Sequence, residues 1–301
     1  MALVNGKTLL NKARQNKIAI GAFNFTTLEQ LKVILKCAES LKQDVIVQVS
    51  ESAIKFMGLK NIVDLVKNES KSLNANVCLN LDHGKSFEIC KMCIDAGFTN
   101  VMIDASDKSF EENIDLTKKV CEYAHKFNVS VEAELGSLKG VEDEVNNITS
   151  HYTNPEEAQY FVTQTKVDSL AVSIGTSHGA YKFEGESMLE IELLKQIAVK
   201  TKLPLVLHGA SMVDEDLIKN FIASGGNIKN AKGVSKQNLT DAIQNGICKV
   251  NMDTDFRISF TTGVRNALKD SSMFNLRDYL NNGMKQMEYE VIKRIKILSN
   301  K

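Results

Sequence analysis

Three of the five histidines in this 301-residue chain end hydrophobic, strand-like runs, and each is followed directly by glycine. They are His83, His178 and His208. Imidazole suits zinc, and three protein ligands with one open position are the pattern of a catalytic rather than a structural zinc site. The histidines therefore predict a metal enzyme. The alternative, three ordinary residues at strand ends, is disfavoured because the arrangement occurs three times.

Carboxylates accompany these histidines at the ends of other strand-like runs. Asp82 directly precedes His83, and a carboxylate near a Lewis-acid metal is a natural general acid or base. Asp104 and Glu134 end two further runs. They could hold a second or alternative cation, or they could orient the histidines from behind. The residues alone leave both roles open.

Eight short runs rich in β-branched and apolar residues recur along the chain, separated by stretches of helical periodicity. Continuous apolar runs are typical of parallel strands that are buried on both faces. Eight strand–helix units predict an α/β fold of the (β/α)8 or TIM-barrel type, with residues 1–301 forming a single domain. The runs are Ile18–Phe23, Asp44–Val49, Asn76–Asp82, Asn100–Asp104, Ser130–Glu134, Ser169–Ile174, Pro204–His208 and Ile247–Asp253.

Three segments are additional to the eight repeated units. The segment Gly136–Asn154 is polar and acidic and predicts a mobile loop after the fifth strand. The segment Ser224–Asn245 predicts an extra helical insertion between the seventh and eighth strands. Leu276–Lys301 predicts a long amphipathic helix as a C-terminal extension.

The active site of such barrels lies at the carboxyl ends of the strands, so polar residues at these ends converge whatever their separation in sequence. Asn24 and Ser50 end the first two runs. The seventh and eighth ends occupy the place where barrels bind phosphate, and they carry backbone and hydroxyl donors. The residues concerned are Gly209, Ala210, Ser211, Asn251, Met252, Asp253 and Thr254.

Basic side chains near these ends strengthen the phosphate interpretation. Lys182 follows His178 closely and can supply a point charge. Arg257 follows the eighth run, and its fork-shaped guanidinium suits bidentate phosphate binding. Arg277 lies far along the chain and could reach the site only if its segment folds back or crosses to another subunit. A solvated surface arginine is an equal alternative for Arg277.

Composition excludes several classes of protein. The formal net charge is zero, which argues against a nucleic-acid or acidic-membrane partner. No apolar run approaches the roughly 20 residues needed to span a bilayer, and the first residues lack a signal-peptide core, so we expect a cytoplasmic protein. Most of the six cysteines lie in apolar stretches, so in a cytosolic chain we interpret them as reduced core residues. A metal or redox role for Cys90 and Cys93 is disfavoured, because the chain has no second pair with this spacing.

Taken together, the motifs resemble those of the class II, zinc-dependent fructose-bisphosphate aldolases from end to end. The matching segments are Gly21-Ala-Phe-Asn-Phe, Leu81-Asp-His-Gly, Val101-Met-Ile-Asp-Ala-Ser, Val131-Glu-Ala-Glu-Leu-Gly, Gly140-Val-Glu-Asp, Gly175-Thr-Ser-His-Gly-Ala-Tyr-Lys, Leu207-His-Gly-Ala-Ser and Lys249-Val-Asn-Met-Asp-Thr-Asp. As a set they are highly specific. One departure is Asn80, where many members carry a histidine.

The resemblance implies a role for each matching residue. The three histidines would hold zinc, which stabilises the enediolate, with Asp104 and Glu134 serving a second cation or an alternative metal position. Asp82 would move the proton of the C4 hydroxyl, and Glu142 the proton on the enediolate carbon. Ser50 would contact the glyceraldehyde-phosphate half. The dihydroxyacetone-phosphate half would bind Gly179, Lys182, Gly209, Ser211 and residues 251–254, beside a sodium or potassium ion.

The resemblance also limits the function. It implies reversible cleavage of fructose 1,6-bisphosphate in glycolysis and gluconeogenesis by a homodimer or homotetramer. The nearest alternative is a tagatose-1,6-bisphosphate aldolase, which is disfavoured because Asp253 stands where that branch often has alanine. A non-catalytic surface binding protein is disfavoured because the three histidines and Asp82 are all present. Three histidines accept zinc, cobalt or iron, so the working metal stays open.

Overall fold

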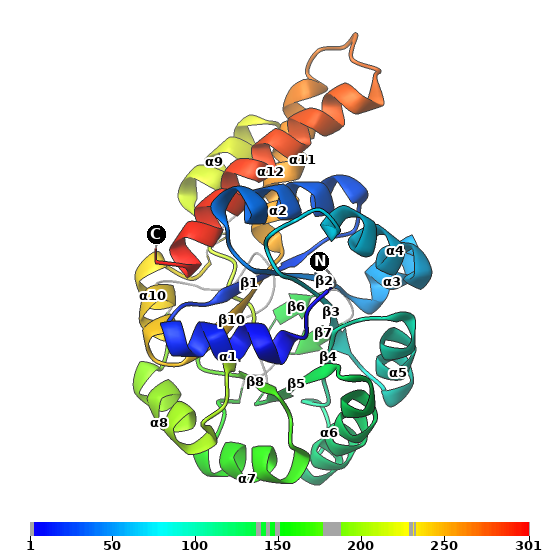
Figure 1. The fold of residues 1–301 in the computed structure, drawn as a ribbon. Helices are drawn as coiled ribbons and strands as arrows, with labels where there is room; N and C mark the ends of the chain where they lie inside the picture. The colour runs from blue at the N-terminus through cyan, green and yellow to red at the C-terminus, as the bar shows by residue number, and fades with distance from the viewer. Residues whose placement is uncertain are drawn as a thin grey trace.

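The computed structural model describes residues 3–136, 140–142, 145–147, 151–176, 188–228, 231 and 233–300. Within these ranges, eight parallel strands close into a TIM barrel in the order β1-β10-β9-β8-β5-β4-β3-β2 (Figure 1). Each predicted strand run overlaps one of these strands, so the predicted fold is confirmed. The strands are β1 (Ile20–Asn24), β2 (Val45–Val49), β3 (Val77–Gly84), β4 (Asn100–Ile103), β5 (Ser130–Leu135), β8 (Ser169–Val172), β9 (Leu205–Leu207) and β10 (Ile247–Met252).

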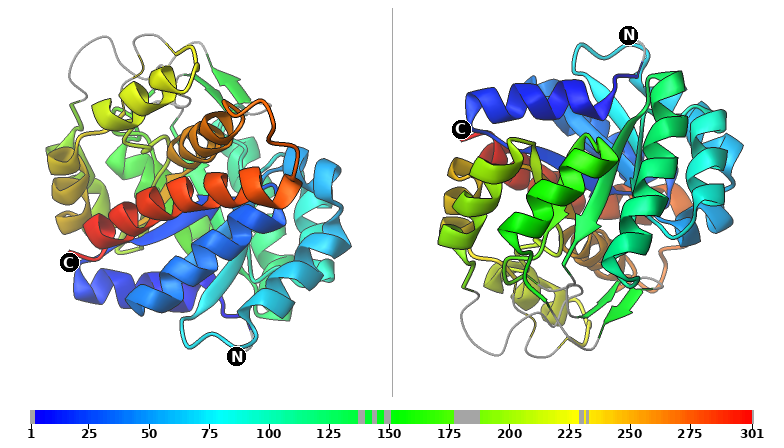
Figure 2. Two further views of the ribbon diagram at one scale, coloured as in Figure 1. Left: turned by 90° about the horizontal axis from the view of Figure 1, so that it is seen from above. Right: turned by 90° about the horizontal axis from the view of Figure 1, so that it is seen from below.

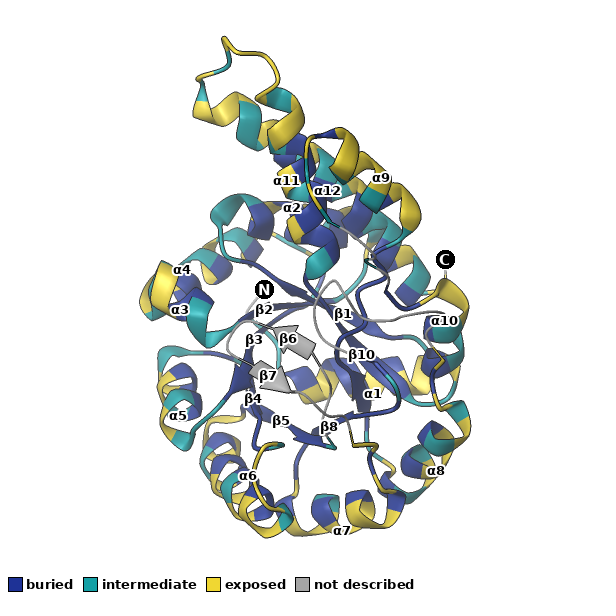
Figure 3. Ribbon diagram, turned by 180° about the vertical axis from the view of Figure 1, so that it is seen from behind, coloured by how far each residue is buried: buried dark blue, intermediate teal, exposed yellow. Residues whose placement is uncertain are grey.

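Helices surround the barrel and bury one face against the strands, while their outer faces are exposed (Figure 3). Side-chain caps fix several helix starts, for example Thr27 before α2 and the capping box of Ser109 and Glu112 at α6. The helices between β1 and β9 are α2 (Leu28–Leu41), α3 (Glu51–Met57), α4 (Leu59–Ser70), α5 (Phe87–Ala96), α6 (Phe110–Ala124), the short 3-10 helix η1 (His125–Phe127), α7 (Pro155–Thr165) and α8 (Ile191–Thr201).

A helix that the sequence did not predict, α1 (Gly6–Asn16), lies across the amino-terminal end of the barrel (Figure 1). Its buried residues Leu9, Leu10 and Ala13 pack against apolar side chains of β1, β2, β3 and β10. The helix therefore closes the barrel floor and leaves the opposite end, where the strands finish, for the functional site.

The segment expected to be a mobile loop contains two short antiparallel strands, β6 (Gly140–Glu142) and β7 (Val145–Asn147). No pattern in the sequence indicated this hairpin, and the mobility of the segment stays a prediction. The insertion before β10 contains α10 (Lys236–Gln244), as expected, and α9 (Glu215–Ala223) precedes it.

The carboxyl-terminal region forms two antiparallel helices, α11 (Thr254–Ala267) and α12 (Leu276–Leu298), whose linked ends project from the barrel (Figure 1). The predicted C-terminal helix is confirmed, and α12 packs along α2 (Figure 2). The backbones of α11 and α12 meet closely at Gly263, where a Cβ atom would lie 2.3 Å from the Asn282 carbonyl oxygen. Phe274 and Leu276, at the projecting end, are 91% and 60% exposed.

Two further sequence-based expectations can be compared with the structure. All six cysteines are buried and unpaired by disulfides, as expected for reduced core residues, and Cys90 and Cys93 lie within α5. Across the described ranges, no helix combines the length and hydropathy that a membrane span requires.

Candidate metal and active site

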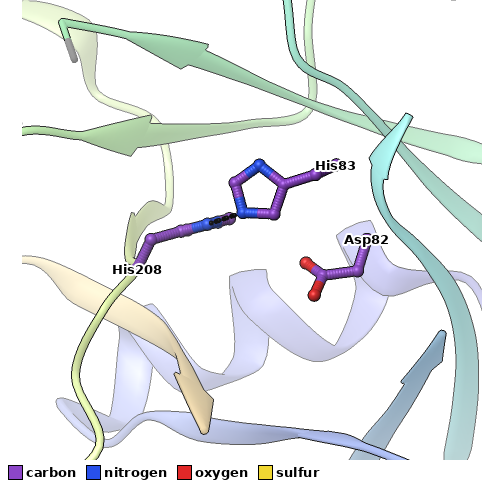
Figure 4. Close-up of side chains that lie close together, drawn as sticks. All are labelled: Asp82, His83 and His208. Carbon is purple, nitrogen blue, oxygen red and sulfur yellow. Dashed lines mark hydrogen bonds between the residues drawn. The ribbon is translucent and has the colours of Figure 1, made fainter. Parts of the chain in front are cut away.

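Asp82 and His83 are consecutive on β3, yet both side chains reach His208 at the end of β9 (Figure 4). Consecutive strand residues normally point to opposite faces. Here the pairing of β3 with β4 shifts register between Leu81 and Gly84, and His83 adopts a left-handed φ of 49°. This local irregularity, of the kind that bulges introduce next to active sites, lets both side chains face the barrel mouth. Ligand atoms of Asp82, His83 and His208 all lie within 4.8 Å of one another.

The two histidines are oriented as metal ligands usually are. His83 Nδ1 lies 2.8 Å from Asp104 Oδ2, and His208 Nε2 lies 2.8 Å from Glu132 Oε1. The remaining nitrogens, His83 Nε2 and His208 Nδ1, face each other at 2.9 Å. A metal-binding histidine almost always has its second nitrogen held by a carboxylate or carbonyl. The donor set therefore fits a metal ion between the two imidazoles, with Asp82 beside it.

The electrostatic field at His83 favours a positive charge. Burial opposes protonation of His83, but Asp104 and Asp82 outweigh it and raise its pKa to about 10. The same carboxylates would attract a metal cation bound to His83. Glu134 is a further buried carboxyl group beside His83, with Oε2 lying 3.8 Å from His83 Nδ1.

Three of the carboxylates around the histidines, Asp104, Glu132 and Glu134, differ in the direction of their pKa shifts. Burial opposes ionisation of Asp104, but His83 and Lys85 hold its pKa well below the usual range. Burial is likewise outweighed at Glu132, where Lys249 and His208 lower the pKa to about 2. Glu134 behaves oppositely, because burial and the neighbouring Asp104 raise its pKa to about 8. Its Oε2 has no hydrogen-bond partner among the described residues, and with His83 and Asp104 it forms a second group of candidate ligands.

Asp82 is held by an amide on each side. Asn24 Nδ2 donates to Asp82 Oδ2 at 2.8 Å, and Asn251 Nδ2 donates to Asp82 Oδ1 at 3.0 Å. Asn251 also lies 3.3 Å from His208 Nε2. Because both oxygens accept hydrogen bonds from fixed amides, the carboxylate is oriented before any substrate arrives.

The predicted phosphate-binding segments come together at the ends of β9 and β10. Gly209 has a left-handed φ of 59°, and the Asp253 N–H donates to Ser211 Oγ at 3.4 Å. The Asp255 carboxylate accepts the N–H groups of Met212 and Val213 at 3.0 and 2.8 Å. Asp255 thus fastens the start of α11 to the loop after β9. The predicted residues of these segments are buried or half-buried: Gly209, Ala210, Ser211, Asn251, Met252, Asp253 and Thr254.

Other predicted residues lie at the edge of the site or away from it. Ser50 caps the start of α3, and its Oγ lies 2.9 Å from Ser52 Oγ. Arg257 Nε forms an ion pair with Asp253 at 2.7 Å and lines a surface pocket with Ser52. Arg277 stands in the first turn of α12, at the end that projects from the barrel, so the structure does not bring it to His83 within this chain (Figure 1).

The functional groups of four predicted residues are not described by the structure. His178, Gly179 and Lys182 lie outside the described residues. Glu142 is the last residue of β6, but its side chain is not described. Their roles stay predictions.

The structure also assigns positions that sequence reasoning missed. Lys249 and Glu132 form a buried ion pair behind His208, and Lys85 Nζ lies 2.8 Å from Asp104. A signal for the first pair was present, because each is a charged residue with an apolar neighbour on either side in its strand, Val131 and Ala133 for Glu132 and Cys248 and Val250 for Lys249.

Comparisons with known proteins agree with this geometry. Residues 4–301 match the family described as "Fructose-bisphosphate aldolase class-II". A fructose-bisphosphate aldolase from Helicobacter pylori (strain J99) is 44% identical, over 99% of this chain and 98% of that protein. One from Thermus caldophilus is 41% identical, over 99% and 98% of the two chains. Among solved structures, the YdjI aldolase from Escherichia coli K12 is 27% identical, with a TM-score of 0.80 over 98% of this chain and 97% of that one.

Proposed function

Because the chain belongs to the class II fructose-bisphosphate aldolase family, we propose that it cleaves fructose 1,6-bisphosphate reversibly into dihydroxyacetone phosphate and glyceraldehyde 3-phosphate. The observation that carries the proposal is the position of Asp82, fixed by two amides beside two histidines whose outer nitrogens are bound to carboxylates. This arrangement supplies a general base next to a metal site, as aldol cleavage without a Schiff base requires.

The metal site is proposed to hold zinc. His83 and His208 would ligate the ion, and His178 would complete the set, as the family resemblance implies. Bound there, the metal would act as a Lewis acid that stabilises the negative charge developing on the C2 oxygen of the ketone half. Asp104 and Glu132 would orient the two ligands. Glu134 and Asp104 would form the alternative position or hold a second cation.

The residues of the chain would carry the protons. Asp82 would accept the proton of the C4 hydroxyl while the bond between C3 and C4 breaks and its electron pair stays with the ketone half. The C4 oxygen becomes the aldehyde of glyceraldehyde 3-phosphate. Glu142 would then deliver a proton to C3, which completes dihydroxyacetone phosphate. Asp82 ends the cleavage with the proton of the C4 hydroxyl and Glu142 ends it without the proton given to C3, so proton exchange of both carboxyl groups with solvent would restore the starting state.

The two phosphates would bind at opposite ends of the site. One would lie against the joined segments 209–211 and 251–254, with Gly179, Lys182 and a sodium or potassium ion. The other would lie near Ser50 and Arg257, with Arg277 contributed by a neighbouring subunit. The exposed Phe274 and Leu276 next to Arg277 support a homodimer or homotetramer in which this end meets a second copy. The six reduced cysteines support a cytoplasmic location.

The test is Asp82→Ala in the metal-loaded enzyme. Cleavage is expected to fall by about 10²- to 10⁴-fold, the range for loss of a general base, with bound metal unchanged. Exchange of the carbon-bound hydrogen of dihydroxyacetone phosphate with solvent deuterium is expected to persist, because that step uses no C4 hydroxyl. A variant with near-normal kcat would remove Asp82 from the mechanism.

A further inference from the structure

We infer that a buried ladder of side-chain amides, which crosses half of the barrel, positions Asp82 for proton transfer. The amide ladder consists of Asn24, Gln48, Asn80 and Asn100, and Ser130 ends it. The inference rests on the proposed function, because it assigns these residues to the step in which Asp82 acts. Only Asn24 touches Asp82, so Gln48, Asn80 and Asn100 would be positioning residues.

The ladder is continuous and short at every step. Asn100 Nδ2 donates to Asn80 Oδ1 at 2.6 Å, and Asn80 Nδ2 donates to Gln48 Oε1 at 3.0 Å. Gln48 Nε2 donates to Asn24 Oδ1 at 2.7 Å, and Asn24 Nδ2 donates to Asp82 Oδ2 at 2.8 Å. All of these side chains are buried, with Gln48 and Asn80 at 0% exposure.

The ladder follows the register of the barrel. Asn24 pairs with Gln48, Gln48 with Asn80, Asn80 with Asn100, and Asn100 with Ser130, as direct partners on successive strands from β1 to β5. Each strand therefore contributes one rung at the same level. The hydrogen-bonded pairing of the strands sets the spacing between neighbouring amides, so the backbone of the barrel holds the ladder in place.

The direction of the ladder is fixed by its Asp82 end. A carboxylate has no proton to donate, so Asn24 must present its NH2 group to Asp82 and its oxygen to Gln48. Gln48 must then present its NH2 group to Asn24, and the same reasoning orients Asn80 and Asn100. Every amide dipole consequently points the same way, and aligned hydrogen bonds of this kind strengthen one another.

The far end of the ladder is closed by α1. The Ser130 hydroxyl donates to Asn100 Oδ1, and the Lys7 N–H at the start of α1 lies 3.3 Å from Ser130 Oγ. Gly6 leaves the room for this contact, because a Cβ atom there would lie 2.6 Å from Asn100 Oδ1. The barrel floor and the proposed general base are thus joined through one line of hydrogen bonds.

Stability alone does not account for this arrangement. Burying amides offers little over apolar side chains of similar shape, because their hydrogen bonds only replace those made with water. A leucine layer would fill the barrel as well, but it could not hold the Asn24 NH2 group against Asp82. The ladder keeps Asn24 from rotating, and Asn24 keeps the carboxylate in place.

The test uses Asn80, which is three hydrogen bonds from Asp82 and touches none of the proposed ligands. Asn80→Leu breaks the ladder. Asn80→Asp keeps the size but replaces the donor facing Gln48 by an acceptor, which turns Gln48 and Asn24 around and sets an oxygen against Asp82. Thr165→Val is the control, because it removes a buried hydroxyl outside the ladder, one that donates to the Phe161 carbonyl and accepts the Val167 N–H.

Both Asn80 variants are expected to lower kcat for fructose-bisphosphate cleavage by about 10- to 100-fold, the range for residues that orient a site from behind. KM, bound zinc and the exchange of the dihydroxyacetone-phosphate hydrogen are expected to change less than about threefold, since none of these depends on Asp82. The control is expected to cleave at the wild-type rate. A structural role alone would lower cleavage and exchange together.

Milder changes at the far end guard against misfolding. Gly6→Ala and Ser130→Ala are expected to lower the cleavage kcat by about twofold to fivefold, as for other mutations along a coupled network, with exchange again unchanged. Unchanged cleavage in folded Asn80 variants of an active enzyme would overturn the inference and leave the proposed function standing, as would a parallel fall in cleavage and exchange. A wild-type protein without cleavage would overturn both.

Discussion

Glu132 and Lys249 form an ion pair of 2.6 Å in which neither side chain is exposed to solvent, and the second oxygen of Glu132 binds His208 Nε2. The pair spans the barrel interior from β5 to β10. Lys249 neutralises the charge of the Glu132 carboxylate, and its contact with one oxygen leaves the other oxygen positioned against His208. The carboxylate therefore holds His208 in the tautomer and orientation that leave Nδ1 toward His83.

Replacing Lys249 by methionine is expected to leave the Glu132 charge buried without a partner. Unfolding free energy, measured in urea, should fall by roughly 3–5 kcal/mol. Zinc affinity, measured by competition with a chelating dye, should fall by about 10- to 100-fold. The double variant with Glu132→Leu should regain stability but not zinc affinity. Unchanged affinity in both would show that Glu132 does not orient His208.

His208→Ala is expected to abolish metal binding and cleavage together, because it removes one of the two facing nitrogens. His125→Ala is the matched control, since His125 is exposed and bonds Asp168 outside the site. Metal content would be measured by atomic emission and cleavage by a coupled assay. Stoichiometric zinc with full turnover in the His208 variant would contradict the ligand assignment.

Asp253→Ala is expected to lower kcat/KM for fructose bisphosphate more than for tagatose bisphosphate. The difference should be about 10- to 100-fold, equivalent to a charged hydrogen bond of roughly 1.5–3 kcal/mol. Asp253→Asn, which keeps a hydrogen-bonding group beside Arg257, should lose less. Equal losses for the two sugars would show that Asp253 does not discriminate between them.

Asp214 gives a prediction for stability in acid. Burial opposes its ionisation, but Lys293 and Arg294 outweigh it and hold its pKa below the usual 3.8. A lowered pKa in the folded state contributes stability above the unfolded value and loses it as the pH falls through the folded value. Asp214→Asn keeps a cap for α9 but removes the charge. The variant should therefore be less stable than the wild type at neutral pH.

The free energies of unfolding of the wild type and of Asp214→Asn should converge as the pH falls below about 3.8, the ordinary pKa of an aspartate. Urea unfolding at a series of pH values measures the difference. Because both proteins share every other titrating group, the difference isolates Asp214. A gap that stays constant down to low pH would mean that the carboxylate charge contributes nothing.

The strands could be predicted from sequence because parallel barrel strands are buried on both faces and read as apolar runs. The helix α1 could not, since its buried face comprises few apolar residues and it precedes the first strand unit. The hairpin of β6 and β7 was missed for a related reason, because three-residue strands in a polar segment carry no periodic signal.

The site could be predicted only at the level of strand ends. Asp82, His83 and His208 were expected to meet because a barrel brings strand ends together, and the structure confirms that they do. The register shift that lets Asp82 and His83 face the same side depends on backbone geometry. The amide ladder depends on register, which no single strand encodes, so Gln48 and Asn100 carried no visible signal. His178, which lies outside the described residues, stays a prediction.

The most direct test compares cleavage of fructose 1,6-bisphosphate and tagatose 1,6-bisphosphate by the purified protein, with and without EDTA. Cleavage that favours the fructose sugar, stops with EDTA and returns with zinc is the predicted result. Preference for the tagatose sugar would keep the mechanism and contradict the assigned substrate. Cleavage that resists EDTA would contradict the metal site formed by His83 and His208, and no cleavage of either sugar would contradict the proposed function.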